Sequence, residues 1–498
     1  MNDKIKAFFA VFPAFFLFFS AFEVSAETRK AFFAGKFYPE KREELAKTVD
    51  KAVSSAEIKI SSGEIIALIA PHAGYEFSAG VASYAYKAVA GKKYDTVVIL
   101  ATAHTMSVEG GAVYADGDFE TPLGKLKVDE ALARKLLKET GLFSENTRAH
   151  SKEHAVEVQL PFLQRTLAPG FKILPIVMNT DSLYSMRRAG EFLAGALKGK
   201  KALIVVSSDL SHYPEHGTAK KVDETTLLAL KTLDPEYFWL TNRILMGRGE
   251  KDLGTAWCGE AAVLAGMSAA AALGADEAVE LKYADSYDEN KAYGNPSGVV
   301  GYAAVLFKDN KEDKRFKPEL SKERKDFLLK LARETVSAKL EGKEIKAGLS
   351  GDYFLNLPGA VFVTLTKNGV LRGCVGSIQP RSTIHDAVIY SALAAAFEDG
   401  RFTPLKKEEL GEVKMEISLL SPLKKVKGAG EILPGKHGVV IMKDSRSGLF
   451  LPQVWEQIPD KTDFLEEICS QKAGLKRDCW KDKDAEIYVF TVDAFEED

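Results

Sequence analysis

The sequence has few cysteines, no excess charge of either sign and, beyond its N-terminus, no long apolar run. Four cysteines in 498 residues exclude the dense disulfide framework of small secreted scaffolds. The 67 basic and 70 acidic side chains give a net charge of −3, so the overall charge does not indicate a nucleic-acid partner. Internal repeats and low-complexity tracts are absent from the sequence. With 46% hydrophobic residues the composition is that of a globular protein, and the length predicts two or three domains.

The N-terminus is the most apolar part of the chain. Two lysines in the first six residues precede residues 7–22, which are apolar apart from Ser20, and small residues follow at Ser25 and Ala26. This order is typical of a secretory signal peptide, here residues 1–26, with cleavage after Ala26. The apolar run has 16 residues, whereas a helix that spans a bilayer needs about 20, so an uncleaved membrane anchor is the alternative interpretation. In both cases we expect the rest of the chain to be exported, periplasmic or extracellular, without membrane contact once the signal is cleaved.

Export would allow disulfide bonds among the four cysteines, for which three pairings exist. Cys469 and Cys479 are close in sequence and lie in one polar segment, so we predict a bridge between them.

A highly charged segment divides the chain. Residues 309–320 are rich in lysine, arginine, aspartate and glutamate and contain few apolar side chains, which is typical of a solvated linker. We therefore predict an N-terminal domain at 27–308 and a C-terminal domain at 321–498. Because the linker offers little apolar surface, we expect the two domains to fold independently.

The N-terminal domain alternates between strand and helix patterns. Apolar strands are predicted at 64–70, 96–104, 172–178 and 201–212, and helical patterns such as 129–140 lie between them. Strands without a polar face predict a sheet that is covered by helices on both sides, which is an α/β architecture.

The C-terminal domain has a different pattern. Residues 359–376 form two strand patterns around Asn368 and Gly369, a pair that strongly favours a tight hairpin turn. Further strands are predicted at 415–421 and 485–492. This half is therefore predicted to be an α+β domain with an antiparallel sheet.

Six of the eight histidines fall between residues 72 and 216, and several stand where a predicted strand ends. His72 follows the first strand, His104 ends the second, and Asp209 and His212 close the fourth. A lone histidine is usually a structural residue, but ligands bind at the carboxyl ends of strands in such sheets, so three cases predict a site. Clustered histidines favour a transition metal such as iron, copper or zinc.

Cys258 is the one cysteine of the N-terminal domain. It is either a small buried hydrophobe or a thiolate ligand of the same metal. Glu260, two residues further on, is a carboxylate that could substitute as a ligand, and His154 is expected to approach the site from a helix.

A competing pattern, HSKEH, occurs at residues 150–154. It fits the H-x-x-E-H motif of some zinc hydrolases, which would place His150 and His154 on one face of a helix with Glu153 as the base. This alternative leaves His72 without a role, so we favour the strand-end site and expect His150 and His216 to lie at the surface.

Several motifs of the N-terminal domain resemble the Memo family. They are AGKFYP at 34–39, PHAGY at 71–75, EHAVEVQLPFL at 153–163, SSDLSHY at 207–213 and GYAAV at 301–305, and the resemblance covers about residues 28–308. Memo-like proteins share a fold with class III extradiol dioxygenases, which use non-haem iron. The resemblance implies metal ligation by His72, His104 and Cys258, with Asp209 and His212 close by. The chain departs from the family at 101–105, where ATAHT replaces the usual Ser-His pair.

The C-terminal domain resembles an AMMECR-type domain over about residues 320–496. The motifs are LRGCVGSIQP at 371–380, AAAFEDGRFTPLKKEEL at 394–410, MEISLLSP at 415–422 and GLFLPQV at 448–454. The resemblance implies an α+β fold without an established activity. The residues that we expect to line a groove are Arg372, Gly373, Cys374, Gly376, Asp399 and Arg401. Cys374 is either a reactive thiol near a guanidinium or a residue of a tightly packed strand.

Families of these two types often accompany a radical S-adenosylmethionine protein in the AmmeMemoRadiSam system, in which they are proteins B and A. The resemblance therefore suggests a link to such a protein, although a cytosolic radical enzyme conflicts with export of this chain.

Three functions are compatible with these patterns. The first is a metal-dependent oxidoreductase of dioxygenase type acting on a small molecule, with iron or copper as the metal, His212 and His154 moving protons and Asp209 orienting an imidazole. The second is a non-catalytic metal-binding or scaffold protein whose C-terminal domain binds a partner. The third is the zinc hydrolase built on His150, Glu153 and His154.

Overall fold

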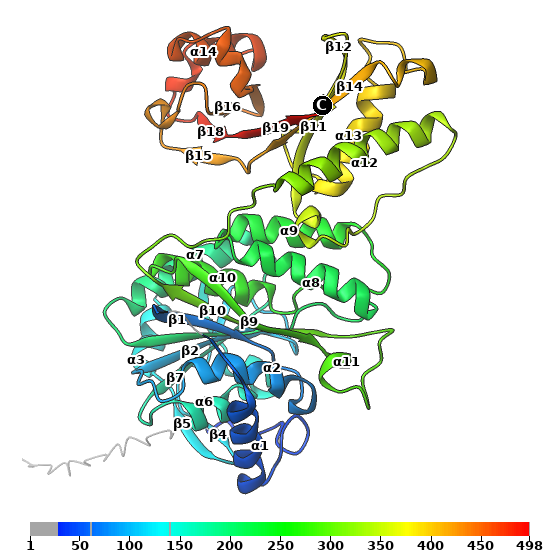
Figure 1. The fold of residues 1–498 in the computed structure, drawn as a ribbon. Coiled ribbons are helices and arrows are strands. Elements are labelled where there is room, and N and C mark those ends of the chain that lie inside the picture. Colours follow the sequence, from blue (N-terminus) through cyan, green and yellow to red (C-terminus); the bar gives the residue numbers. More distant parts are fainter. Residues whose placement is uncertain (1–27, 60–61, 139–140, 498) are drawn as a thin grey trace, which may run out of the picture.

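The structure, a computed structural model, describes residues 28–59, 62–138 and 141–497. The predicted signal peptide lies outside these residues. Within them, no helix is both long enough and apolar enough to cross a membrane. Figure 1 shows an N-terminal domain around one large sheet and a C-terminal domain with separate, smaller sheets.

Eight strands form the sheet of the N-terminal domain, in the order β6-β3-β7-β2-β8-β1-β10-β9. Their bounds are β1 Glu64–Ala70, β2 Thr96–Thr102, β3 Gly111–Val113, β6 Phe143–Glu145, β7 Lys172–Met178, β8 Ala202–Ser207, β9 Glu277–Asp285 and β10 Gly301–Asp309. Strands β7, β2, β8 and β1 are parallel neighbours, whereas β10 runs antiparallel to β1. The carboxyl ends of these four parallel strands therefore meet at one edge of the sheet.

Helices cover both faces of this sheet, which explains why its strands are apolar throughout. One face packs against α1 Arg42–Ser55, α2 Tyr75–Ala88 and α6 Leu160–Thr166, and the other against α7 Leu183–Leu197, α8 His216–Leu230, α9 Pro235–Gly247 and α10 Glu260–Ala272. The short elements are β4 Asp118–Thr121, β5 Gly124–Lys127, α3 Glu130–Leu136, α4 Thr147–Ser151, α5 His154–Glu157 and α11 Ser286–Glu289. The predicted α/β architecture is confirmed.

The fourth predicted strand is shorter than its apolar pattern suggests. It ends at Ser207, and the next residues leave the sheet: the Leu210 N–H donates to the Gly301 carbonyl, and the His212 N–H donates to the Thr255 carbonyl. Tyr213 then takes a left-handed backbone conformation with a φ of 76°. The polar residues at this strand end therefore lie in a loop that is held by two distant segments.

The C-terminal domain contains two antiparallel sheets. The first comprises β11 Pro358–Lys367, β12 Val370–Gly376, β13 Ser382–Thr383, β14 Val413–Leu420 and β19 Val492–Glu496, and the second comprises β15 Lys424–Val426, β16 Gly438–Lys443, β17 Arg446–Phe450 and β18 Glu486–Phe490. Helices α12 Lys322–Leu340 and α13 Ile384–Phe397 pack against the first sheet. The predicted hairpin joins β11 and β12, and both Asn368 and Gly369 have positive φ values, 54° and 77°, as a type I′ turn requires.

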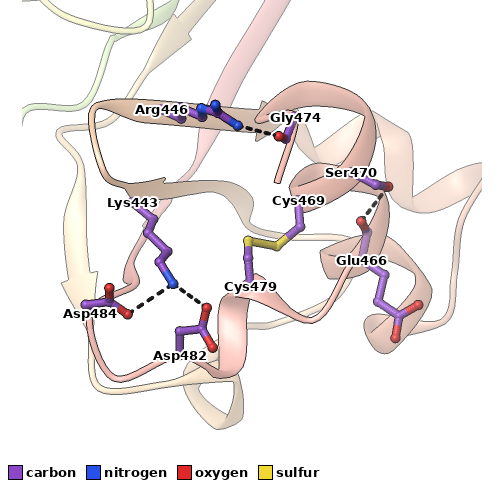
Figure 2. Close-up of a disulfide and its surroundings, with 9 residues drawn as sticks. All are labelled: Lys443, Arg446, Glu466, Cys469, Ser470, Gly474, Cys479, Asp482 and Asp484. Atoms are coloured by element: carbon purple, nitrogen blue, oxygen red, sulfur yellow. Dashed lines mark hydrogen bonds and ion pairs between the residues drawn. A yellow bond between two sulfur atoms is a disulfide. The ribbon is translucent and has the colours of Figure 1, made fainter. Parts of the chain in front are cut away.

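The predicted disulfide between Cys469 and Cys479 is confirmed and is drawn in Figure 2. It follows α14 Lys461–Glu467 and closes a small, separate core next to the second sheet. The Lys443 ammonium pairs nearby with the carboxylates of Asp482 and Asp484. A small core buries little apolar surface of its own, and a covalent link is a common supplement to such a core.

The two domains are in contact rather than merely linked. Helices α8 and α9 lie between the N-terminal sheet and the C-terminal domain in Figure 1, and one apolar core continues across the boundary. The linker itself is largely exposed, but Phe316 is half-buried, its N–H donates to the Lys231 carbonyl, and Leu320 is buried. The Glu312 and Lys314 N–H groups also donate to Asp276, so the charged segment is held at several points and is not solvated throughout.

Candidate metal centre

Three predicted ligands from three distant parts of the chain meet at one point. The side-chain donor atoms of His72, His104 and Cys258 all lie within 4.8 Å of one another. His72 follows β1, His104 follows β2, and Cys258 directly precedes α10. Because β1 and β2 flank β8, the order of the sheet alone brings the two histidines to the same edge.

A chain of hydrogen bonds determines which ring nitrogen of His72 is free. The Ser207 hydroxyl donates to the Ala155 carbonyl at 2.6 Å, so its oxygen accepts from His72 Nδ1 at 3.1 Å. Gln159 Nε2 also donates to the Ser207 oxygen, at 2.9 Å. Since Nδ1 carries the proton, Nε2 presents a lone pair toward Cys258 Sγ, 3.1 Å away. Burial, reinforced by His104, lowers the pKa of His72 to about 3, so the ring is neutral.

Glu153 holds His104 in the equivalent way. The His104 backbone N–H donates to one carboxylate oxygen of Glu153 at 2.7 Å, and Nδ1 lies 2.9 Å from the other. Nδ1 therefore donates, and Nε2 is left free for a metal. Burial opposes ionisation of Glu153, but the hydrogen bond and charge of His104, with the Ala155 N–H, outweigh it and lower the pKa of Glu153 to about 2.

His154 lines the same centre. Its ring stacks on His104, with centroids 4.5 Å apart, and packs against Phe37, with centroids 4.7 Å apart. Burial, followed by the nearby His72 and His104, lowers the pKa of His154 to about 3. At neutral pH this imidazole is therefore a proton acceptor next to the candidate ligands.

Cys258 is oriented by the backbone of the loop after β8 and by the Thr102 side chain at the end of β2. The Asp209 N–H donates to Cys258 Sγ at 3.3 Å, and the Cys258 carbonyl accepts from the Thr102 hydroxyl at 2.9 Å. Burial and the neighbouring Asp209 carboxylate raise the pKa of the Cys258 thiol. A thiolate at this position therefore requires a nearby cation, which a bound metal would supply. Glu260 does not join the cluster, because its carboxylate pairs with Arg243.

Asp209 and His212 form the opposite side of the site. The Asp209 Oδ1 atom accepts from the His72 backbone N–H at 2.7 Å, and Oδ2 lies 3.9 Å from His72 Nε2. His212 Nδ1 lies 3.0 Å from the Leu210 carbonyl, which makes it the donor and leaves Nε2 free. Burial raises the pKa of Asp209.

The expectation that His150 lies at the surface is wrong, whereas His216 is partly exposed. His150 is buried, with Nε2 bonded to the Ala112 carbonyl at 3.0 Å, and it belongs to none of the candidate metal groups among the described residues. The HSKEH motif does not form one helix, because α4 ends at Ser151 and Glu153 is extended before α5 begins. The geometry that the hydrolase alternative needs is therefore absent. His216 is only partly exposed and pairs with Asp285 at 2.5 Å.

Sequence reasoning missed the residues that support the ligands. Gln159 is held by the Tyr86 hydroxyl and donates to both Pro71 and Ser207. Glu157 is fully buried and accepts from Arg29. Both belong to the EHAVEVQLPFL motif, where polar residues interrupt an apolar stretch, and that interruption was the available signal.

The residues predicted to line a groove in the C-terminal domain lie at or next to β12. β12 is an edge strand, and the Cys374 N–H donates to Asp399 Oδ2 at 2.9 Å while the Cys374 carbonyl accepts from Arg401 at 3.2 Å. Arg401 also pairs with Asp399, and Arg372 pairs with Glu409. A side chain on Gly373 would collide with the Ala395 carbonyl, and Gly376 is equally crowded by β11. These contacts cap and pack an edge strand, and Gly376 also lines a pocket beside it, so the predicted groove stays a prediction.

The fold and the cluster define a class: an α/β protein with a candidate transition-metal centre at the carboxyl edge of its parallel strands. The chain belongs to the Memo family, since residues 29–306 match the family described as Memo-like protein. Residues 329–495 match the AMMECR1 family, so both domains occur in one chain.

Individual relatives show the same division. A MEMO1 family protein of Methanopyrus kandleri is 33% identical over 285 residues, which cover 55% of this chain and 97% of that protein. A protein of Aquifex aeolicus is 44% identical over 184 residues, which cover 34% of this chain and 91% of that protein. A solved structure from Pyrococcus horikoshii is 37% identical, covers 36% of this chain and 94% of that chain, and has a TM-score of 0.33.

Proposed function

We propose that the N-terminal domain binds a redox-active metal ion, iron or copper, through His72, His104 and Cys258 and is an oxidoreductase of dioxygenase type. The observation that carries this proposal is the matched orientation of the two histidines. Each donates from Nδ1 to a buried acceptor, Ser207 or Glu153, and each leaves Nε2 free beside the Cys258 sulfur. Such acceptors are the usual supports of metal-binding imidazoles.

Three protein ligands would leave positions for oxygen and a small-molecule substrate. The metal, when bound, supplies electron transfer and oxygen binding. The chain supplies the groups that move protons. His154 is a neutral imidazole and His212 is a partly buried one with a free Nε2, and both are placed to accept and return protons. Phe37 packs against His154 and closes one side of the site. Asp209 orients two of the candidate ligands: its carboxylate accepts from the His72 backbone N–H, and its own N–H donates to the Cys258 sulfur.

The test is metal analysis of untagged protein, followed by oxygen consumption with a series of catechols. We expect stoichiometric iron or copper in the native protein and at least tenfold less in His72→Ala. His437→Ala, which changes a histidine outside every described candidate cluster, should retain the metal. Metal without oxygen consumption would favour the scaffold alternative, and absence of metal from a folded native protein would contradict the proposal.

We further propose that the protein acts outside the cytoplasm. The predicted signal peptide supports this, as does the Cys469–Cys479 disulfide, because disulfides persist in oxidising compartments. N-terminal sequencing of the protein from its native host should then begin at Glu27, whereas an intact Met1 would indicate the anchor or no export.

A further inference from the structure

The C-terminal domain contains a pocket between α13 and the end of strand β12. Its volume is about 230 Å³, which suits a small molecule. The floor is apolar: Val361 of β11 and Val375 of β12 form it, and α13 contributes the small side chains of Ala387 and Ala394. Of the six residues predicted to line a groove in this domain, the pocket includes Gly376 alone, so it is a separate feature.

The segment that follows β12 turns its polar side chains into this pocket. Ser377, Gln379 and Arg381 line it, whereas Ile378 and Pro380 between them line a different depression, which α9 borders. This alternation is that of an extended chain, in which successive side chains point to opposite sides. The Ser377 N–H donates to a carbonyl of β11 at 3.0 Å and holds the segment against the sheet. A row of polar groups therefore stands beside the apolar floor.

Arg381 is exposed and is the one cation of the pocket, whose lining contains no acidic residue. It has no hydrogen-bond or ion-pair partner in the part of the chain that the structure describes. Every other arginine from residue 322 onward donates to a carboxylate or a carbonyl: these are Arg324, Arg333, Arg372, Arg401, Arg446 and Arg477. The guanidinium of Arg381 is therefore available to an anion from outside the chain.

Gln379 adds a second donor beside this guanidinium. Its backbone N–H and carbonyl are both bonded to the Ser377 hydroxyl, and its side-chain amide has no partner among the described residues. A guanidinium fork and an amide N–H are donors that the two oxygens of a planar carboxylate can accept from. No lysine lines the pocket, so its single positive charge matches one carboxylate.

An aromatic ring stands at the rim of the pocket. Tyr390 on α13 is 53% exposed, and it lies three residues after Ala387 and four before Ala394. Residues at this spacing share one face of a helix, here the face that lines the pocket. The small side chains leave space next to the tyrosine ring, and a second ring could pack there against both the tyrosine and the apolar floor.

We propose that this pocket binds a small aromatic carboxylate, with the carboxylate on Arg381 and Gln379 and the ring between the apolar floor and Tyr390. Each part of the ligand is matched by one part of the pocket: the charge by the unpaired guanidinium, the ring by the exposed tyrosine, and the size by the volume. The inference is independent of the function proposed for the N-terminal domain.

The experiment is a ¹⁹F nuclear magnetic resonance titration of 4-fluorobenzoate with the full chain. We expect line broadening with a dissociation constant of about 1 mM, because so small a ligand makes few contacts. The neutral analogue 4-fluorobenzyl alcohol should bind at least about tenfold more weakly. Arg381→Gln, which keeps a polar side chain but removes the charge, should weaken binding of the benzoate by the same factor. Arg446→Gln is the matched control, since it removes an arginine from the second sheet of the same domain, and it should bind normally.

Two further substitutions test the ring position. Tyr390→Ala should weaken binding several-fold whereas Tyr390→Phe should not, because phenylalanine retains the ring. Ala394→Leu fills the floor and should abolish binding. A circular dichroism spectrum of each variant establishes that it is folded. Absence of binding to the native chain, equal binding of the alcohol, or unchanged affinity in Arg381→Gln would overturn the proposal. So would a loss of binding in His72→Ala with retention in Arg381→Gln, which would place the ligand in the N-terminal domain.

Discussion

At the residue scale, the candidate ligands depend on side chains that would never touch a metal. Ser207 shows this best, since its hydroxyl proton is used by the Ala155 carbonyl and its oxygen must therefore accept from His72. The tautomer of His72 is thus a consequence of a neighbouring backbone group. Without that arrangement the ring could rotate or present the wrong nitrogen.

Ser207→Ala should weaken metal binding by about 10–100-fold, because the proton on His72 Nδ1 loses its hydrogen-bond acceptor. The dissociation constant can be measured by competition with a chelator. Ser207→Thr keeps a hydroxyl and should restore most of the affinity. An unchanged affinity in Ser207→Ala would show that the hydrogen bond does not orient the ligand.

His150 provides a pH prediction away from the ligands. Burial lowers its pKa to about 4, Nε2 is bonded to Ala112, and Nδ1 is buried without a partner among the described residues. Its pKa is lower in the folded than in the unfolded chain, so the unfolded chain binds more protons between about pH 4 and 6.5. This contribution to stability is therefore complete above about pH 6.5 and is lost as the pH falls toward 4.

Between pH 7 and pH 5, His150 should account for about 2 kcal/mol of the fall in the free energy of unfolding. The measurement is urea denaturation of the metal-free protein at both pH values. His150→Gln should lose less stability over this interval than the native chain, whatever its stability at pH 7. Equal losses in the two proteins would mean that the pKa of His150 does not differ between the folded and unfolded chains.

At the element scale, the segment that precedes α1 forms one wall of the site. Glu157 on α5 accepts from the Arg29 guanidinium, from the Phe33 N–H and from the Tyr38 hydroxyl. Arg29 in turn donates to the carbonyl of Glu153, the residue that holds His104. The buried carboxylate of Glu157 therefore holds residues 29–38 against α5, beside the candidate ligands.

Glu157→Gln should destabilise the protein by about 3 kcal/mol, because it leaves the Arg29 charge buried without a counterion. Hydrogen exchange should rise at residues 29–38 before it rises elsewhere. Glu120→Gln is the matched control, since an exposed ion pair such as the one with Lys30 contributes little to stability. Similar effects of the two substitutions would show that the buried pair has no special role.

At the scale of the whole molecule, the linker is not what holds the domains together. A buried ion pair joins Arg248 at the end of α9 to Asp386 on α13, and the Thr225 hydroxyl donates to the Tyr353 carbonyl. These contacts accompany the apolar core that continues from α9 into the C-terminal domain. The expectation of independently folding domains remains a prediction, but each isolated domain would expose this surface.

A protease site inserted between Lys311 and Glu312, where the linker is exposed, tests this contact. After cleavage the two domains should stay associated in analytical ultracentrifugation at micromolar concentration. Asp386→Ala should weaken the association by at least about tenfold, because it leaves Arg248 buried and unpaired. Asp326→Ala, which breaks an exposed ion pair with Lys322, is the control. Immediate separation of the native halves would show that the linker alone joins them.

The sequence by itself determined the four parallel strands at the centre of the N-terminal sheet, their apolar faces and the order of His72, His104 and Cys258 along the chain. This was possible because a strand that is buried on both faces is apolar along its whole length, and because the carboxyl ends of parallel strands lie at one edge of the sheet. The hairpin at Asn368 and Gly369 and the short-range disulfide were likewise predictable, since a few neighbouring residues decide each.

Only the tertiary structure decided the orientation of each candidate ligand and which ring nitrogen each histidine leaves free. Gln159 reaches Pro71 across 88 residues and His72 reaches Ser207 across 135, and no local pattern records such pairs. For the same reason the surface position expected for His150 was wrong, and the one helix that the HSKEH alternative needs does not form, because the buried carboxylate of Glu153 binds His104 and begins a new helix. A hydrogen bond between distant segments depends on how the whole chain packs, and packing is a property of the folded molecule.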